Sequence, residues 1–229
     1  VGDRVAVLLR NCTEYVACII APMRIGAIAV PLNPKYPDDE LKQIFQNCKP
    51  AVIITFPEMV RKLKKFPNIL KNLKSVIVEH NRSWIRGGIH SNLNEVLSIG
   101  ISQKLSYRAK QSDEALYAYT SGTTGVPKGI VFTHRRLSRK LSFLRGIVEK
   151  YVYPAIGRGL RTFNIDVQND SIYILGGFYH AGKLPGAMLP FLRLGISVYG
   201  EEGFSPRKTL LTLSSENITT LVANPFHFG

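Results

Sequence analysis

The segment from Tyr117 to Gly129 carries the side chains of this sequence that are best suited to binding phosphate. Residues 120–129 hold four hydroxyl side chains, three glycines and one lysine. Glycines let successive backbone N–H groups turn toward one concavity, and hydroxyls add further donors. The ammonium of Lys128 supplies a compact positive charge. This combination predicts a loop that holds the triphosphate of a nucleotide.

The order of residues in this loop differs from two well-known phosphate-binding motifs. A Walker loop has Gly-Lys-Ser/Thr at the start of a helix, whereas Lys128 here lies between a proline and a glycine. Gly122 and Gly125 also have the wrong spacing for the dinucleotide fingerprint. The alternative without a binding function is a flexible Ser/Gly linker. A linker, however, would not lie between two apolar runs, residues 115–119 and 129–133.

Short apolar runs alternate along the chain with stretches of helical period, which predicts an α/β fold with mostly parallel sheets covered by helices. The predicted strands are residues 4–9, 27–31, 51–55, 75–79, 115–119, 129–133, 171–175, 196–199 and 219–224. The predicted helices are residues 14–25, 38–47, a basic helix from 58, 135–151, 184–194 and 206–216. Residues 81–112 are polar and weakly periodic, so we expect an irregular connection there with one short helix, and the internal subdomain boundary.

Composition excludes several classes of protein. Hydrophobic residues make up 45% of the chain, which argues against wholesale disorder and low-complexity structure. Three cysteines without a CxxC pair support neither a disulfide scaffold nor a zinc ribbon, and predict reduced thiols in a cytosolic compartment. The longest apolar stretch, residues 15–32, contains prolines and an arginine and predicts a helix followed by a buried strand rather than a membrane span.

The chain is strongly basic, with 30 Lys and Arg against 16 Asp and Glu and a net charge of +14. One basic cluster covers residues 61–65, and a second one, at residues 135–140, repeats at i, i+4 and so predicts one solvated face of a helix. No zinc-finger spacing, RNP motif or KH loop accompanies these clusters, so we expect no nucleic acid partner. Peripheral contact with anionic lipid stays open as an alternative.

At residues 117–128 the sequence resembles the adenylate-forming (AMP-binding) enzymes, which include acyl-CoA synthetases, 4-coumarate-CoA ligases, beetle luciferases and peptide-synthetase adenylation domains. The resemblance extends to residues 2–9 with Asn11, and to residues 24–34, 178–180, 204–206 and 219–225, and to His134. The family's motifs for adenine, ribose and magnesium, its hinge and its C-terminal domain with a catalytic lysine do not occur before Gly229. The resemblance therefore implies that residues 1–229 are an incomplete N-terminal AMP-binding domain without the C-terminal domain.

The resemblance also implies a two-step reaction. A substrate carboxylate attacks the α-phosphate of ATP to give an acyl-adenylate, and the thiol of CoA, as co-substrate, then displaces AMP. Lys128 is implied to neutralise the leaving pyrophosphate, and Thr124 to help hold Mg²⁺. His180 is implied to be the catalytic gate between the nucleotide and acyl pockets. The residues implied to cradle the β- and γ-phosphates are Thr120, Ser121, Gly122, Thr123, Thr124 and Gly125.

Two departures from the family pattern lie at the edge of the predicted acyl pocket. Gly177 stands where the family has a proline, and Gly182 falls one residue early. We therefore expect this edge of the pocket to differ from that of other members. His134 is expected to be structural, satisfying the backbone near the loop, and the remaining histidines have no partners at metal-ligand spacing.

These observations predict a carboxylic acid–CoA ligase that acts on a fatty or aryl acid, in lipid metabolism if the acid is fatty. The 229-residue chain alone is expected to be inactive. Two alternatives stay open: a non-catalytic nucleotide-binding remnant, and a luciferase-type or peptide-synthetase-type adenylation domain. No signal peptide or membrane span is predicted, so we expect a cytoplasmic location or the cytosolic face of an organelle membrane.

Overall fold

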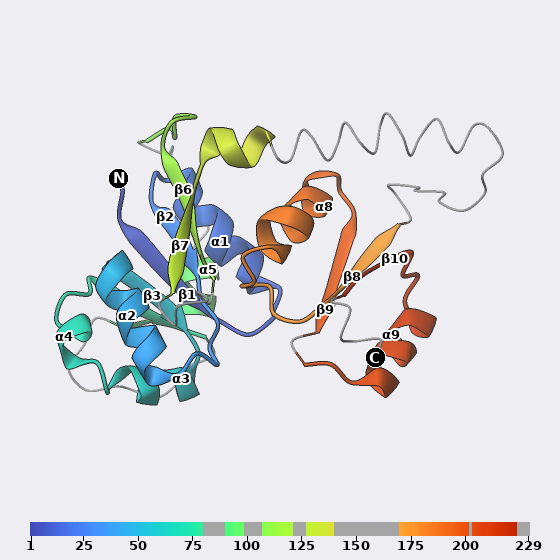
Figure 1. The fold of residues 1–229 in the computed structure, drawn as a ribbon, viewed down its shortest axis with the longest axis horizontal. Helices are drawn as coiled ribbons and strands as arrows, with labels where there is room; N and C mark the ends of the chain where they lie inside the picture. The colour runs from blue at the N-terminus through green and yellow to red at the C-terminus, as the bar shows by residue number, and fades with distance from the viewer. Residues whose placement is uncertain (80–89, 99–106, 121–126, 140–169, 202, 224–229) are drawn as a thin grey trace. The chain divides into compact units, whose positions relative to one another are not determined.

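The computed structural model describes residues 1–79, 90–98, 107–120, 127–139, 170–201 and 203–223 (Figure 1). The chain divides into two compact units, Val1–His134 and Arg135–Gly229, and each unit has its own sheet. The boundary that the sequence predicted near residues 81–112 lies inside the first unit, because described strands on both sides of it belong to one sheet.

The first unit is an α/β layer structure. Its strands are β1 (Arg4–Leu8), β2 (Ile28–Pro31), β3 (Val52–Thr55), β4 (Ser75–Val78), β5 (His90–Asn92), β6 (Glu114–Thr120) and β7 (Lys128–Thr133). Its helices are α1 (Glu14–Arg24), α2 (Asp38–Cys48), α3 (Pro57–Leu63), α4 (Pro67–Leu70) and α5 (Leu93–Ser98). In the described residues these strands form one sheet in the order β5-β4-β3-β1-β2-β6-β7, and β6–β7 is its one antiparallel pair. The predicted α/β class with mostly parallel strands is confirmed.

The order in which strands are added to the sheet changes direction at β1. The chain passes from β1 to β2 on one side and then returns to β3 on the other side of β1. Right-handed crossovers therefore place α1 on one face of the sheet and α2 on the opposite face. The core agrees, because α2 and α3 pack on Ala6 and Leu8 of β1 in a cluster that contains no residue of α1. Figure 1 shows α2 and α3 on one side of the strands and α1 on the other.

One face of the core is built from α2, α3 and alternate residues of the strands. Leu41, Phe45 and Leu63 are buried there among strand residues such as Ile53. Phe45 meets Phe66 edge to face, with ring centroids 5.9 Å apart. Such a pair stabilises the fold by about 1 kcal/mol beyond the apolar area that it buries. The helical period read from the sequence thus corresponds to real burial.

The basic cluster at residues 61–65 is partly neutralised within the first unit. Asp38, in the first turn of α2, accepts from Lys65 at 2.6 Å and lies 3.5 Å from the ammonium of Lys62. The pKa of Asp38 is lowered, chiefly by the hydrogen bond from Lys65.

Within the described residues, no helix has the length and apolar character needed to cross a bilayer.

The second unit has a smaller parallel sheet. Its strands β8 (Ser171–Leu175), β9 (Ser197–Glu201) and β10 (Thr220–Val222) lie in the order β10-β8-β9. Helix α9 (Pro206–Ser215) begins after Ser205, whose hydroxyl accepts from the N–H of Lys208 at 3.5 Å. The carboxylate of Glu201 is buried at the end of β9 and accepts from the hydroxyls of Tyr173 at 2.7 Å and Thr209 at 3.3 Å.

Two local predictions need correction. The helix predicted over residues 184–194 is a π-helical turn, η2 (Leu184–Met188), followed by a short α8 (Leu189–Arg193). The N–H of Leu189 donates five residues back to Leu184, and Pro190 has no N–H to continue an α-helical ladder. The predicted connection at residues 81–112 also contains β5, which pairs with β4.

The helix predicted over residues 135–151 is helical in its described part, which ends at residue 139.

We predict that Gly26→Ala destabilises the first unit far more than Gly2→Ala. Both glycines have φ of +77°, so each alanine costs about 1 kcal/mol in backbone strain. At Gly26 the new Cβ would also overlap the ring of Tyr107, whereas at Gly2 it meets open space. Urea unfolding followed by circular dichroism should show a loss of at least about 2 kcal/mol for Gly26→Ala. Equal losses for the two variants would contradict this account.

Candidate functional site

The predicted phosphate loop is carried by the β6–β7 hairpin. Thr120 and Lys128 are the last paired residues of the two strands, and the Thr120 hydroxyl donates to the Lys128 carbonyl at 3.4 Å. The pairing brings these two predicted site residues together at the base of the loop. The side chain of Lys128 is exposed. The predicted site residues between them, Ser121, Gly122, Thr123, Thr124 and Gly125, lie outside the described residues.

Tyr119 and Gly129 hold the base of the hairpin in place. They face each other across the two strands, and a Cβ at Gly129 would lie 3.2 Å from the Tyr119 ring. A side chain at this position would require the ring to shift by a few tenths of an ångström, so glycine fits best under the tyrosine. The Tyr119 hydroxyl donates to the side-chain carbonyl of Asn47 on α2. The ring is buried in the core, so the hairpin is anchored to the helix layer.

His180 lies after the carboxyl end of β8, and its local structure determines its protonation. The N–H of Gly182 donates to Nδ1 of His180 at 3.1 Å. Nδ1 is therefore the unprotonated nitrogen, and Nε2 carries the hydrogen and can donate. Partial burial of the ring, with a smaller contribution from the charge of Lys183, lowers the pKa of His180. The imidazole is thus neutral at physiological pH.

Lys183 is a buried cation beside His180 that the sequence analysis did not single out. Its ammonium donates to the carbonyl of Leu175, the last residue of β8, and a Cβ on Gly176 would lie 2.7 Å from it. Burial lowers the pKa of Lys183. The available signal was a lone lysine at the start of an apolar stretch, residues 184–192. That pattern is weak because long lysine side chains often reach from apolar segments to solvent.

One of the two departures from the family pattern, Gly177, has a steric explanation. A Cβ on Gly177 would overlap the ring of Tyr179, so the tyrosine occupies the space that a proline ring would need. A Cβ on Gly182 would lie 3.4 Å from the His180 ring, which is ordinary contact. The glycine substitution and the bulky Tyr179 therefore belong together, and the N–H of Gly182 remains a donor to His180.

His134 follows β7, and its backbone N–H donates to the carbonyl of Asp113 at 3.0 Å. Its ring nitrogen Nε2 is buried and has no hydrogen-bond partner in the part of the chain that the structure describes. The backbone contact is the kind of structural role that the sequence predicted. The imidazole itself does not supply the predicted hydrogen bond to the backbone through Nε2.

The comparisons with known proteins agree with this architecture. A family model described as AMP-binding enzyme matches residues 1–228. This chain belongs to the AMP-binding enzyme family. The resemblance seen at residues 117–128 is therefore confirmed, and the chain shares its family with acyl-CoA and 4-coumarate-CoA ligases.

The relatives of this AMP-binding chain include CoA ligases and nonribosomal peptide synthetases. A long-chain-fatty-acid–CoA ligase of Bacillus subtilis is 25% identical over 98% of this chain and 41% of its own length. A 4-coumarate–CoA ligase of Humulus lupulus is 26% identical over 95% of this chain and 37% of its own length. The crystal structure of an acyl-CoA synthetase of Brucella canis has a TM-score of 0.76 at 26% identity, over 99% of this chain and 38% of that one. The chain thus spans about two-fifths of the length of these proteins.

We predict that His180 titrates below its ordinary pKa of 6.5 and that Lys183→Met moves the midpoint back up. Removing the neighbouring positive charge makes protonation of the imidazole easier, so the shift must be upward. The ring-proton resonances followed by NMR across pH 4–9 would measure it. Lys208→Met is the control, because Lys208 lies 3.5 Å from the Glu201 carboxylate instead. A midpoint unchanged by Lys183→Met, or lowered by it, would refute the assignment.

Proposed function

We propose that the protein containing this chain is an ATP-dependent carboxylic acid–CoA ligase that forms an acyl-adenylate. The observation that carries the proposal is the β6–β7 hairpin of an AMP-binding chain, which pairs Thr120 with Lys128 at the base of a Gly/Ser/Thr loop. A carboxylate is a poor acyl donor, and transfer of AMP to it creates a mixed anhydride with a good leaving group. Relatives named as fatty-acid and coumarate ligases support a fatty or aryl acid as substrate.

In this proposal the loop acts by positioning and by electrostatic stabilisation. Negative charge accumulates on the pyrophosphate as its bond to the α-phosphate breaks, so donors and cations fixed beforehand lower the barrier. The exposed ammonium of Lys128 is available to the β- and γ-phosphates, and the paired backbone keeps its Cα in place. Thr124 stays the predicted hydroxyl ligand of Mg²⁺, which would neutralise further phosphate charge when bound.

His180 is proposed to donate a hydrogen bond from Nε2–H to the reacting groups at the acyl pocket. A neutral imidazole can hold a carboxylate or phosphate oxygen without forming a strong ion pair that would stabilise the ground state. The hydrogen bond from Gly182 fixes this tautomer, and the lowered pKa keeps the ring uncharged. This role agrees with the position of His180 beyond the carboxyl end of a parallel strand, where α/β sheets bind ligands.

We predict that Lys128→Ala in the full-length protein lowers carboxylate-dependent ATP–pyrophosphate exchange about a hundredfold. The cause is the loss of a charge that interacts with the leaving group. Lys110→Ala is the matched control, since Lys110 is an exposed lysine on the same unit and should leave exchange within twofold of wild type. Tight ATP binding without exchange for any acid in the wild-type protein would instead favour the nucleotide-binding remnant.

We predict that His180→Ala lowers kcat for adenylate formation by at least about tenfold, whereas His180→Asn retains more activity because its amide can still donate. Quenched-flow measurement of acyl-AMP separates this step from the later attack by the thiol. Equal losses in the two variants, with unchanged KM values, would show that donation from this position does not matter. A purely structural role would lower the free energy of unfolding in both variants, which urea titration would reveal.

A further inference from the structure

The first unit has a ligand-binding position that the proposed function does not use. In an open α/β sheet, a crevice forms outside the carboxyl ends of two neighbouring strands whose following connections go to opposite faces. Strands β1 and β3 meet this condition, because β1 is followed by α1 on one face and β3 by α3 on the other. The residues that follow the ends of β1, β3 and β4 therefore surround a natural site.

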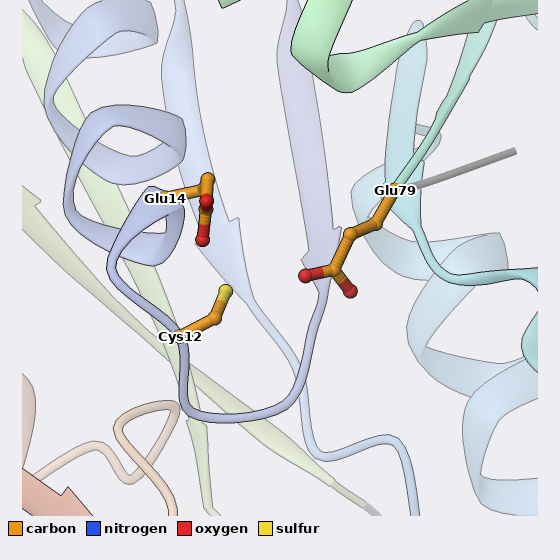
Figure 2. Close-up of side chains that lie close together, drawn as sticks. All are labelled: Cys12, Glu14 and Glu79. Atoms are coloured by element: carbon orange, nitrogen blue, oxygen red, sulfur yellow. The ribbon is translucent and has the colours of Figure 1, made fainter.

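Three metal-ligating side chains come together at this edge. The sulfur of Cys12, a carboxylate oxygen of Glu14 and a carboxylate oxygen of Glu79 all lie within 4.8 Å of one another. Cys12 and Glu14 belong to the connection from β1 into α1, and Glu79 directly follows β4. Figure 2 shows the Cys12 thiol between the two carboxylates, with the side chains coming from two separate segments.

Thr55, the last residue of β3, holds the two segments in register. Its side chain is fully buried, and its hydroxyl donates to the carbonyl of Leu8 at the end of β1, at 3.3 Å. Its own carbonyl accepts from the N–H of Glu79 at 2.8 Å. One residue thus ties the end of β1 to the end of β4. The separation between the Cys12 loop and Glu79 is set by the sheet rather than by flexible chain ends.

The electrostatics of the cluster favour a cation. All three side chains are half-buried, so their charges are screened less than on an open surface. A bound divalent cation would offset the negative charge of the two carboxylates and would deprotonate a coordinating thiol outright.

We propose that Cys12, Glu14 and Glu79 bind one zinc ion, with water completing a tetrahedral site. Zinc accepts thiolate and carboxylate ligands at about 2.0–2.3 Å, so two ligands of one tetrahedral ion lie roughly 3.3–3.8 Å apart. The three ligand atoms, which all lie within 4.8 Å of one another, would have to draw closer together around the ion. Magnesium and calcium disfavour a thiolate ligand, and copper(I) prefers an all-sulfur set. The ion would link the β1–α1 connection to the end of β4.

Cobalt(II) substitution tests the proposal on the full chain. Titration of the reduced protein should give one equivalent bound, a thiolate-to-cobalt charge-transfer band, and displacement by one equivalent of Zn²⁺. Cys12→Ser should abolish the band, and Glu14→Gln and Glu79→Gln should each weaken zinc binding at least tenfold. Glu58→Gln is the control carboxylate, because Glu58 pairs with Arg10 at 2.9 Å, and Cys18→Ala is the control thiol. Both controls should bind zinc within twofold of wild type.

A second measurement avoids variants that fail to fold. Zinc should protect Cys12 of the wild-type protein from alkylation by iodoacetamide, as read by peptide mass spectrometry, and removal of zinc by a chelator should restore the reaction. Cys18 and Cys48 are buried and serve as internal references. Absence of a thiolate band, unchanged binding in Cys12→Ser, or equal alkylation with and without zinc would overturn the proposal. Binding of several equivalents without protection would show an adventitious ion only.

Discussion

The first unit depends on one constraint, the burial of residues 5–8 in β1. Residues 5–8 of this strand are almost inaccessible to water, so every backbone N–H and C=O in it needs a partner within the protein. Parallel strands on both sides supply those partners: β2 pairs from Arg4 to Val7, and β3 pairs from Val5 to Leu8. A strand that is paired on both edges and covered on both faces must be central. Its place fixes the order of the other strands and leaves the crevice between β1 and β3.

The phosphate-loop hairpin is a consequence of the same sheet. Strand β6 joins the sheet beside β2, and β7 adds to its outer edge in the antiparallel direction. A hairpin at a sheet edge could slip in register, which would turn each side chain to the other face. Tyr119 prevents this, because its ring fits over Gly129 and its hydroxyl reaches Asn47 on α2. A slip by one residue would remove the ring from the core and leave the amide of Asn47 without this donor.

Local patterns in the sequence predicted most of the described elements. Apolar β-branched runs such as residues 52–55 and 171–175 became strands within about one residue, because burial on both faces is visible in composition alone. β5 was missed because His90–Asn92 is short and polar, and its pairing depends on β4 rather than on its own residues. The π-helical turn was missed because helical periodicity does not show which carbonyl each N–H group bonds. Here the N–H of Leu189 donates five residues back, in a segment that contains Pro185 and Pro190.

Among the candidate site residues too, those that are neighbours in the sequence could be predicted, and those brought together by the sheet could not. The pairing of Thr120 with Lys128 at the base of the loop was predictable because the loop motif and the two strands that flank it are local in the sequence. The convergence of Cys12 and Glu79 was not, since it depends on the register of β1, β3 and β4 and on one hydroxyl of Thr55. The three cysteines have no paired spacing in the sequence, which gave no sign of this cluster. Ligands drawn from connections after different strands leave no spacing signature, because the sheet brings them together.

Lys183 shows how a buried charge can act without touching a reactant. Burying an ammonium costs several kcal/mol unless the charge gains partners, and in the described residues its hydrogen bond goes to the carbonyl of Leu175. The bond from Lys183 to Leu175 spans the turn at Gly176. At this glycine, a φ of +94° turns the backbone away from the sheet, toward His180. The same charge makes protonation of the imidazole less favourable. The ammonium therefore does two things at once: it bonds across the turn, and its charge adds to the partial burial that already lowers the pKa of His180.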